Sequence, residues 1–148
     1  MPESQVIQSG DGGIRIVLNA SQSHRTQSSR FLTDVFGSGV QHIAFATTDM
    51  TATVARLTQN GVNLLAIPEN YYDDLEAKTD LPSERIAALK NHNILYDRDG
   101  DGEYLQVYTE TFENRYFFEI VERRRGYNGY GAVNAPIRLA AQARLVPE

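Results

Sequence analysis

Short apolar runs, bounded by glycine, proline or polar residues, divide the chain into alternating strand and helix patterns. Behind two glycines, residues 40–46 form an apolar run rich in β-branched and aromatic side chains, which predicts a buried strand. Residues 116–122 form a second such run. Between these strands the pattern predicts a helix over 50–60, a strand over 62–67, helices over 71–78 and 83–90, and strands over 93–97 and 104–109.

The two ends of the chain carry further predicted elements. The glycine-rich stretch 10–13 predicts a tight turn, and the alternation over 14–18 predicts a half-buried strand, so the chain opens on a hairpin. A polar loop over 19–26 precedes a short helix over 27–36. An amphipathic helix is expected over 135–145.

The helix predicted over 50–60 has clear sequence signals at both ends. Asp49 provides a side-chain cap for its start, and Asn60-Gly61 is a typical stop signal. Residues 40–122 therefore follow a β-α-β-β-β order, with two short helices inserted before the later strands.

Length and composition favour one globular domain. The chain has 148 residues, of which 41% are hydrophobic and 22% charged. Its net charge of -5 gives no reason to expect a nucleic-acid partner, because phosphate binding requires clustered basic residues. The one basic cluster, Arg123 to Arg125, is typical of a solvated strand end.

The absence of certain residues excludes several chemistries. The chain contains no cysteine, which excludes disulfides, thiolate catalysis and cysteine-based zinc sites. The N-terminus lacks the basic start and apolar core of a signal peptide, and no run approaches the ~20 apolar residues of a membrane span. We therefore expect a cytoplasmic protein without a membrane partner.

Two polar residues interrupt the most apolar strand patterns. His42 lies within the first, and Glu119 within the second, where an unpaired carboxylate costs several kcal/mol or takes up a proton. A salt bridge to one of the three neighbouring arginines, or a histidine bonded to a backbone carbonyl, explains each residue separately. Together they favour a divalent-metal site, because imidazole plus carboxylate suits Fe, Mn, Co or Zn.

Other candidate motifs have simpler explanations. His24 and His92 lie in polar surroundings, and we expect both to be exposed and unliganded. Residues 97–102 imitate the front of a calcium loop, but the twelfth position is Tyr108, so a hairpin connection is the better interpretation. The glycine-rich segment 126–131 is interpreted as a lid ahead of the last helix.

Six motifs occur in an order that resembles the C-terminal domain of the 4-hydroxyphenylpyruvate dioxygenase-like family, part of the vicinal-oxygen-chelate proteins. They are Gly-Val-Gln-His-Ile-Ala at 39–44, Tyr-Tyr at 71–72, Ile-Leu-Tyr-Asp-Arg-Asp at 94–99, Leu-Gln-Val-Tyr-Thr at 105–109, Phe-Phe-Glu-Ile-Val-Glu-Arg at 117–123 and Gly-Tyr-Gly-Ala-Val-Asn at 129–134. A narrower resemblance is to the domain fused behind a barrel in bacterial 3-dehydroshikimate dehydratases, through Asn-Tyr-Tyr-Asp-Asp-Leu at 70–75 and the tail at 127–139.

The resemblance implies an α+β fold of the vicinal-oxygen-chelate type, in which βαβββ modules pair around a metal. Residues 1–148 are then a single, N-terminally incomplete domain. In this division, 1–36 end a first module, 37–123 form the second module, and 124–148 form a C-terminal lid and helix.

The resemblance also implies site residues. His42 and Glu119 match two of the family's three iron ligands, and the third ligand falls in the part of the first module that precedes this chain. The metal implied is Fe(II) for a dioxygenase, with Mg, Mn or Co as alternatives. Polar positions matching the family's substrate pocket are Asn19, Gln27, Gln41, Gln106, Tyr130 and Asn134. For Gln41 and Gln106, bonding to backbone groups between strands remains an equal alternative.

Two functions follow from the resemblance. The first is an accessory dioxygenase-like domain of a 3-dehydroshikimate dehydratase-type protein, with metal binding as an option, and it is expected to be inactive alone. The second is an Fe(II)-dependent dioxygenase acting on an aromatic 2-oxo acid. The first is preferred, because one ligand is missing and Tyr130 replaces a ring-stacking phenylalanine. The partners implied are a small aromatic or shikimate-type acid, and either a second copy of the chain or a missing N-terminal domain.

Overall fold

The structure, a computed structural model, describes residues 3–20, 27–113 and 115–145. The chain forms two compact units, Met1–Gly39 and Val40–Glu148. The division of one incomplete domain into the segments 1–36, 37–123 and 124–148 stays a prediction.

The first unit contains a β-hairpin and a helix. Strands β1 (Glu3–Gln8) and β2 (Arg15–Ala20) pair antiparallel, and α1 spans Gln27–Asp34. The predicted hairpin is confirmed. The predicted half-burial of its second strand is wrong, because a two-stranded ribbon has no second layer of its own, and the apolar side chains Ile14, Ile16 and Leu18 are exposed.

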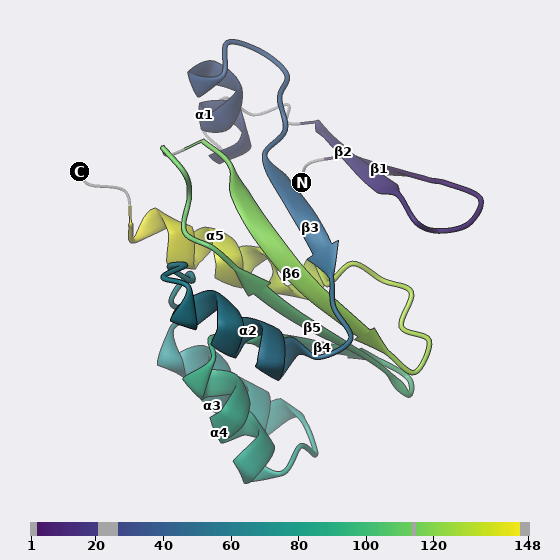
Figure 1. Cartoon of the computed structure of the whole chain (residues 1–148), viewed down its shortest axis with the longest axis vertical. Coiled ribbons are helices and arrows are strands. Elements are labelled where there is room, and N and C mark those ends of the chain that lie inside the picture. Colours follow the sequence, from purple (N-terminus) through teal and green to yellow (C-terminus); the bar gives the residue numbers. More distant parts are fainter. Residues whose placement is uncertain (1–2, 21–26, 114, 146–148) are drawn as a thin grey trace. The chain divides into compact units, whose positions relative to one another are not determined.

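The second unit is built on a four-stranded sheet in the order β3-β6-β5-β4 (Figure 1). Strands β3 (His42–Ala46) and β6 (Phe117–Arg124) run parallel, whereas β5 (Gly102–Tyr108) pairs antiparallel with both β6 and β4 (Leu95–Asp99). Parallel neighbours require a crossover, and the helices between β3 and β4 supply the intervening chain. This confirms the predicted α+β class and, once the strand predicted over 62–67 is left out, the β-α-β-β-β order.

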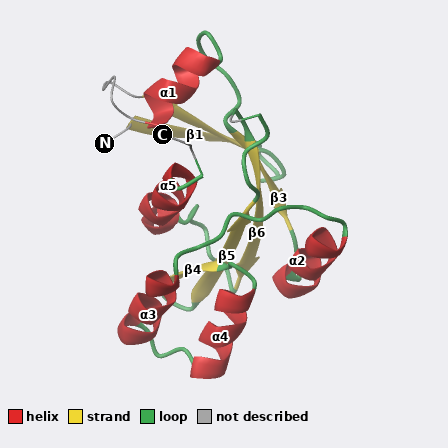
Figure 2. Ribbon diagram, turned by 90° about the vertical axis from the view of Figure 1, so that its left-hand side faces the viewer, coloured by secondary structure: helices red, strands yellow, loops and turns green. Residues whose placement is uncertain are grey.

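Helices cover both faces of this sheet. Figure 2 shows α2 (Met50–Gln59) and α5 (Ala135–Ala143) on opposite faces. The remaining helices are α3 (Glu69–Lys78), α4 (Ser83–Asn91) and η1 (Ala132–Asn134), a single 3-10 turn that leads into α5. No helix in the described ranges is long and apolar enough to cross a membrane.

Helix α2 begins and ends where its sequence signals predict. The Asp49 side chain accepts a hydrogen bond from the Ala52 N–H at 2.9 Å, and Gly61 follows the helix with a φ of 78°. The first residue, Met50, is completely buried, and its N–H donates to Glu122 Oε2 at 2.8 Å. This contact ties α2 to the sheet.

The strand predicted over 62–67 is wrong. The segment makes only an isolated bridge, in which Leu64 faces Thr109. Further pairing stops because the Ile67 N–H donates to the side chain of Asn93 at 2.9 Å, and Pro68 follows with no N–H to donate. The apolar pattern over 62–67 therefore indicates burial rather than a strand, since Leu65 and Ile67 belong to the hydrophobic core.

Gly131 precedes η1 at a position that requires glycine. Its φ is 63°, and a Cβ atom placed on it would lie 2.3 Å from Gln106 Oε1. Gly61 also has a positive φ, but a Cβ atom on it would meet no other atom within 4 Å. The two glycines therefore share the backbone conformation and differ in the space beside it.

We expect Gly131→Ala to lower the free energy of unfolding by about 2 kcal/mol or more, since the left-handed conformation alone costs an L-residue about 1–2 kcal/mol. Gly61→Ala carries the conformational cost without the collision with Gln106. Equilibrium urea denaturation of both variants measures the difference. Equal destabilisation by the two substitutions would show that Gln106 does not restrict position 131.

Candidate functional site

The structure brings His42 and Glu119 together on the face of the sheet that α5 covers. In the parallel pairing of β3 with β6, His42 is opposite Phe117, and Glu119 lies two residues further along β6 on the same face. The His42 ring stacks on Phe117, with centroids 5.0 Å apart. His42 Nε2 lies 3.5 Å from Glu119 Oε2, so the two side chains are direct neighbours.

A chain of amides holds the buried carboxylate of Glu119. Gln106 Nε2 donates to Glu119 Oε1 at 2.9 Å and to the Tyr108 hydroxyl at 2.8 Å. Asn134 Nδ2 donates to Gln106 Oε1 at 2.8 Å, which fixes the orientation of the Gln106 amide. Burial raises the pKa of Glu119, and the bonds from Gln106 and Tyr108 partly oppose that rise.

The three arginines after Glu119 have other acceptors. Arg124 pairs with Glu122 at 2.6 Å, Arg125 pairs with Glu103 at 2.9 Å, and Arg123 donates to the Gly129 carbonyl at 3.1 Å. A salt bridge from this cluster therefore does not explain the carboxylate of Glu119. The amide chain and His42 are its neighbours instead.

His42 is held as a neutral imidazole. Burial, followed by the positive charge of Arg138, lowers the pKa of His42 to about 4. Its Nδ1 atom is buried and has no hydrogen-bond partner in the described part of the chain, so a bond to a backbone carbonyl does not account for this histidine. A neutral imidazole is the form that binds metal ions.

The donor set around this pair is incomplete for a metal held by protein alone. No group of three histidine, cysteine, aspartate or glutamate residues suited to a metal occurs in the described ranges. His42 Nε2 and Glu119 Oε2 face each other and can occupy two coordination positions of a metal ion whose other positions stay open to small ligands. The two residues thus fit a metal as a partial ligand set.

Arg138 is a site residue that the sequence analysis missed. Its guanidinium lies over the rings of Phe117 and Tyr108, 5.2 and 5.7 Å from their centroids, and Nη1 donates to Gln142 Oε1 at 2.7 Å. A signal was present in the sequence, because Asn134 just before the predicted helix and Arg138 and Gln142 within it recur every four residues and form a polar stripe.

The predicted pocket residues are distributed unevenly. Gln106 and Asn134 are buried in the amide chain, whereas Gln41 is half-buried and its backbone carbonyl accepts from the Phe117 N–H at 3.2 Å. Tyr130 is 47% exposed. In the first unit, Asn19 is exposed on β2, and Gln27 begins α1 with a side chain outside the described residues.

The secondary candidates are also located, apart from His24, which lies outside the described residues. His92 is half-buried, so its predicted exposure is wrong, because it forms the C-cap of α4 where the chain turns toward β4. The calcium-like segment is the predicted hairpin, with Asp99 paired to Gly102.

The glycine-rich segment 126–131 follows β6. Its Tyr127 ring stacks on the Tyr104 ring, with 4.8 Å between the centroids.

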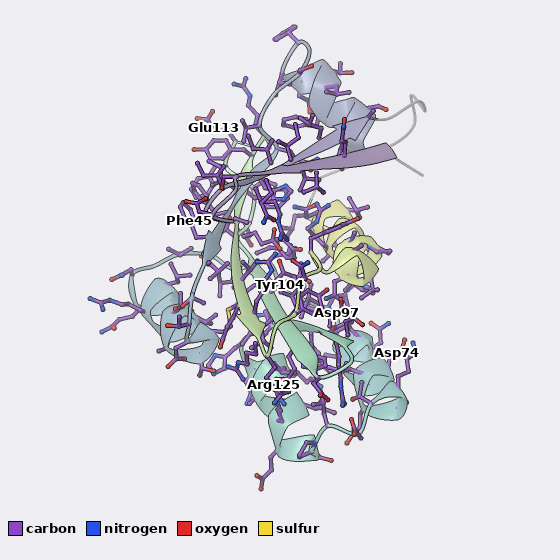
Figure 3. All side chains as sticks on the ribbon, turned by 90° about the vertical axis from the view of Figure 1, so that its right-hand side faces the viewer. Phe45, Asp74, Asp97, Tyr104, Glu113 and Arg125 are labelled. Atoms are coloured by element: carbon purple, nitrogen blue, oxygen red, sulfur yellow. The ribbon has the colours of Figure 1, made fainter. Side chains whose placement is uncertain are left out.

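A cavity of about 800 Å³ lies beside the amide chain, and its lining includes residues of α3, β4, η1 and α5, among them Tyr71 and Asn134. Figure 3 labels two of its acidic lining residues, Asp74 on α3 and Asp97 on β4. The Tyr71 hydroxyl donates to Asn134 Oδ1 at 3.3 Å. Hydrogen bonds thus run from this cavity through Asn134 and Gln106 to Glu119.

Comparison with known families and proteins gives consistent matches. The profile of the Glyoxalase/Bleomycin resistance protein/Dioxygenase superfamily matches residues 1–107. The chain is 50% identical over 142 residues to a 3-dehydroshikimate dehydratase of Pseudomonas aeruginosa, covering 95% of this chain and 22% of the relative. It is 37% identical to a 4-hydroxyphenylpyruvate dioxygenase of the same species, covering 83% of this chain and 35% of the relative.

Solved structures show the same fold. A xylose isomerase-like TIM barrel/4-hydroxyphenylpyruvate dioxygenase fusion protein aligns with a TM-score of 0.83 and 48% identity, over 95% of this chain and 23% of that one. A mutant of 4-hydroxymandelate synthase from Streptomyces coelicolor gives a TM-score of 0.83 and 32% identity, over 95% of this chain and 41% of that one. The chain therefore spans about a fifth of the length of the dehydratase it matches.

The lowered pKa of His42 predicts a pH dependence of stability. Between pH 6.5 and about 4 the unfolded chain binds a proton at His42 that the folded chain does not, so stability falls as the pH falls through this window. The loss is at most about 3 kcal/mol, at 1.36 kcal/mol for each pKa unit. Urea denaturation at pH 7 and pH 4.5, in EDTA, measures it.

His42→Gln removes this titration and is expected to flatten that part of the profile. His92→Gln, which changes a histidine outside the site, is the matched control and keeps the wild-type profile. If the wild type and His42→Gln lose the same stability between pH 7 and pH 4.5, His42 is not held neutral by the fold.

Proposed function

Because the chain belongs to the Glyoxalase/Bleomycin resistance protein/Dioxygenase superfamily, we propose that it acts as the dioxygenase-like, accessory part of a 3-dehydroshikimate dehydratase-type protein. The observation that carries this proposal is the 50% identity to such a dehydratase over 95% of the chain. The dehydration chemistry belongs to the rest of that protein. The chain itself contributes ligand or metal binding, or assembly with a further domain or a second copy.

His42 and Glu119 are the proposed metal-binding residues. Their facing atoms, Nε2 and Oε2, are 3.5 Å apart, and the imidazole is neutral at neutral pH. A divalent metal bound there supplies a Lewis acid with open positions for oxygen ligands. Fe(II) is the metal proposed for dioxygenase-like chemistry, with Mg, Mn or Co as alternatives.

The surrounding residues position these two donors. Gln106 occupies Glu119 Oε1, which leaves Oε2 beside His42, and Asn134 holds the Gln106 amide in the donating orientation. Phe117 stacks on the imidazole and fixes its plane. Such supporting contacts orient a ligand before it binds a metal.

An enzyme is the second candidate function. The 37% identity to a 4-hydroxyphenylpyruvate dioxygenase favours an Fe(II)-dependent dioxygenase acting on an aromatic 2-oxo acid. The accessory function ranks first, because the described residues bring together two metal donors rather than three. In either case we propose a small aromatic or shikimate-type acid as ligand and a cytoplasmic location. The proposed contact residues are Asn19, Gln27, Gln41, Gln106, Tyr130 and Asn134.

Metal titration tests the proposed site. We expect His42→Ala and Glu119→Ala each to weaken Mn²⁺ or Fe²⁺ binding at least about tenfold, since each removes one of two donors from the protein. His92→Ala is the control and keeps the wild-type affinity. Unchanged affinity in the two site variants would mean that both side chains serve only the fold.

Oxygen uptake separates the two candidate functions. Iron-loaded protein supplied with 4-hydroxyphenylpyruvate is expected to show no turnover above that of Glu119→Ala. Turnover that depends on Glu119 would contradict the accessory function and favour the dioxygenase.

A further inference from the structure

Arg138 is a cation outside every ion pair of the described residues. Its side chain is half-buried between α5 and the sheet, and none of those ion pairs includes it. Its guanidinium lies over the Phe117 and Tyr108 rings. Burial lowers the pKa of Arg138, and the nearby Tyr108, which also shares a side-chain hydrogen bond with it, and Glu119 only partly oppose that change. Burying a cation is costly unless an opposite charge or hydrogen bonds compensate it.

The groups around Arg138 also have unused hydrogen-bonding capacity. The Gln142 Oε1 atom accepts a hydrogen bond from Arg138. The Nε2 group of the same amide, a hydrogen-bond donor, takes no part in this bond. Gln142 Nε2 and His42 Nδ1 are both buried, and neither has a hydrogen-bond partner in the described ranges. Buried polar atoms are normally satisfied, so the unpaired Nε2 donor of Gln142 beside a cation without an ion pair indicates a missing acceptor.

A partner that accepts hydrogen bonds and carries negative charge satisfies both Gln142 Nε2 and the Arg138 cation. A guanidinium presents five N–H donors in a planar fork that matches a carboxylate, and Gln142 Nε2 adds donors from the same helix face. The Tyr108 and Phe117 rings beside the guanidinium suit an apolar or aromatic body attached to that carboxylate.

We propose that Arg138 and Gln142 of α5 bind the carboxylate of a small organic acid beside the His42–Glu119 pair. The inference rests on the proposed function for the class of ligand, a small acid, and does not require a metal at His42 and Glu119. The competing explanation is that Arg138 only packs on the two rings and contributes to stability. The two explanations differ in how the protein discriminates a carboxylate from its uncharged isostere.

Benzoate and benzamide are matched probes, because they share the ring and differ in charge. Isothermal titration of the full chain in EDTA measures both. We expect wild type to bind benzoate more tightly than benzamide. Arg138→Met, which keeps the bulk over the rings, is expected to weaken benzoate binding about tenfold or more and to leave benzamide binding unchanged. Arg144→Met removes an exposed arginine next to α5 and is the control with wild-type affinity.

Gln142→Glu is a second, independent variant. It places a carboxylate where the Gln142 amide accepts from Arg138, so it pairs with the guanidinium and competes with the ligand. We expect it to weaken benzoate binding while the far-ultraviolet circular dichroism stays that of wild type. If Arg138→Met does not fold, this variant decides the question.

Three results would overturn the inference. They are equal affinity of wild type for benzoate and benzamide, wild-type benzoate affinity in folded Arg138→Met or Gln142→Glu, and equal losses in Arg138→Met and Arg144→Met. A fourth result, benzoate binding that requires added Mn²⁺ and does not depend on Arg138, would also overturn it while supporting the proposed metal site. Arg138-dependent binding in a protein that binds no metal would support it and contradict the metal site instead.

Discussion

The structure of the second unit depends on keeping the carboxylate of Glu119 inside a sheet. A buried carboxylate is tolerated only where hydrogen bonds replace its lost water, and here Gln106 supplies the bond. Gln106 is itself held by Asn134, so residues on β6, β5 and η1 act as one unit. The sheet, the turn before α5 and the candidate site therefore share one set of contacts.

This constraint explains several features of the surrounding chain. Gly131 allows the backbone to pass close to the Gln106 amide, and the Tyr127 hydroxyl accepts from the Gly131 N–H at 3.1 Å. The segment after β6 is thereby fixed against the sheet. This sets the start of α5 at Ala135, and from that start Arg138 reaches the ring beside His42. The contacts that satisfy Glu119 thus also bring the Arg138 cation to the site.

Much of this arrangement could be predicted from the sequence, because short apolar runs rich in β-branched and aromatic residues identify buried strands, and a polar residue inside such a run identifies a buried polar group. His42 and Glu119 were found in this way. Arg138 was missed because a lone arginine on an amphipathic helix is normally solvated, although its spacing from Asn134 and Gln142 marks a shared face. The prediction of a strand over 62–67 is wrong because tertiary contacts replace sheet pairing there. One of them is the hydrogen bond that the Ile67 N–H donates to the Asn93 side chain.

The most direct test of this account is the coupling between Gln106 and Glu119 in a double-mutant cycle. Free energies of unfolding are measured at pH 7 for wild type, Gln106→Leu, Glu119→Leu and the double variant. The account predicts that the two changes are not additive, with a coupling of about 1 kcal/mol or more, because each single change leaves the other buried polar group without its partner. Additive changes would contradict it, since they would mean that the carboxylate does not depend on the Gln106 amide.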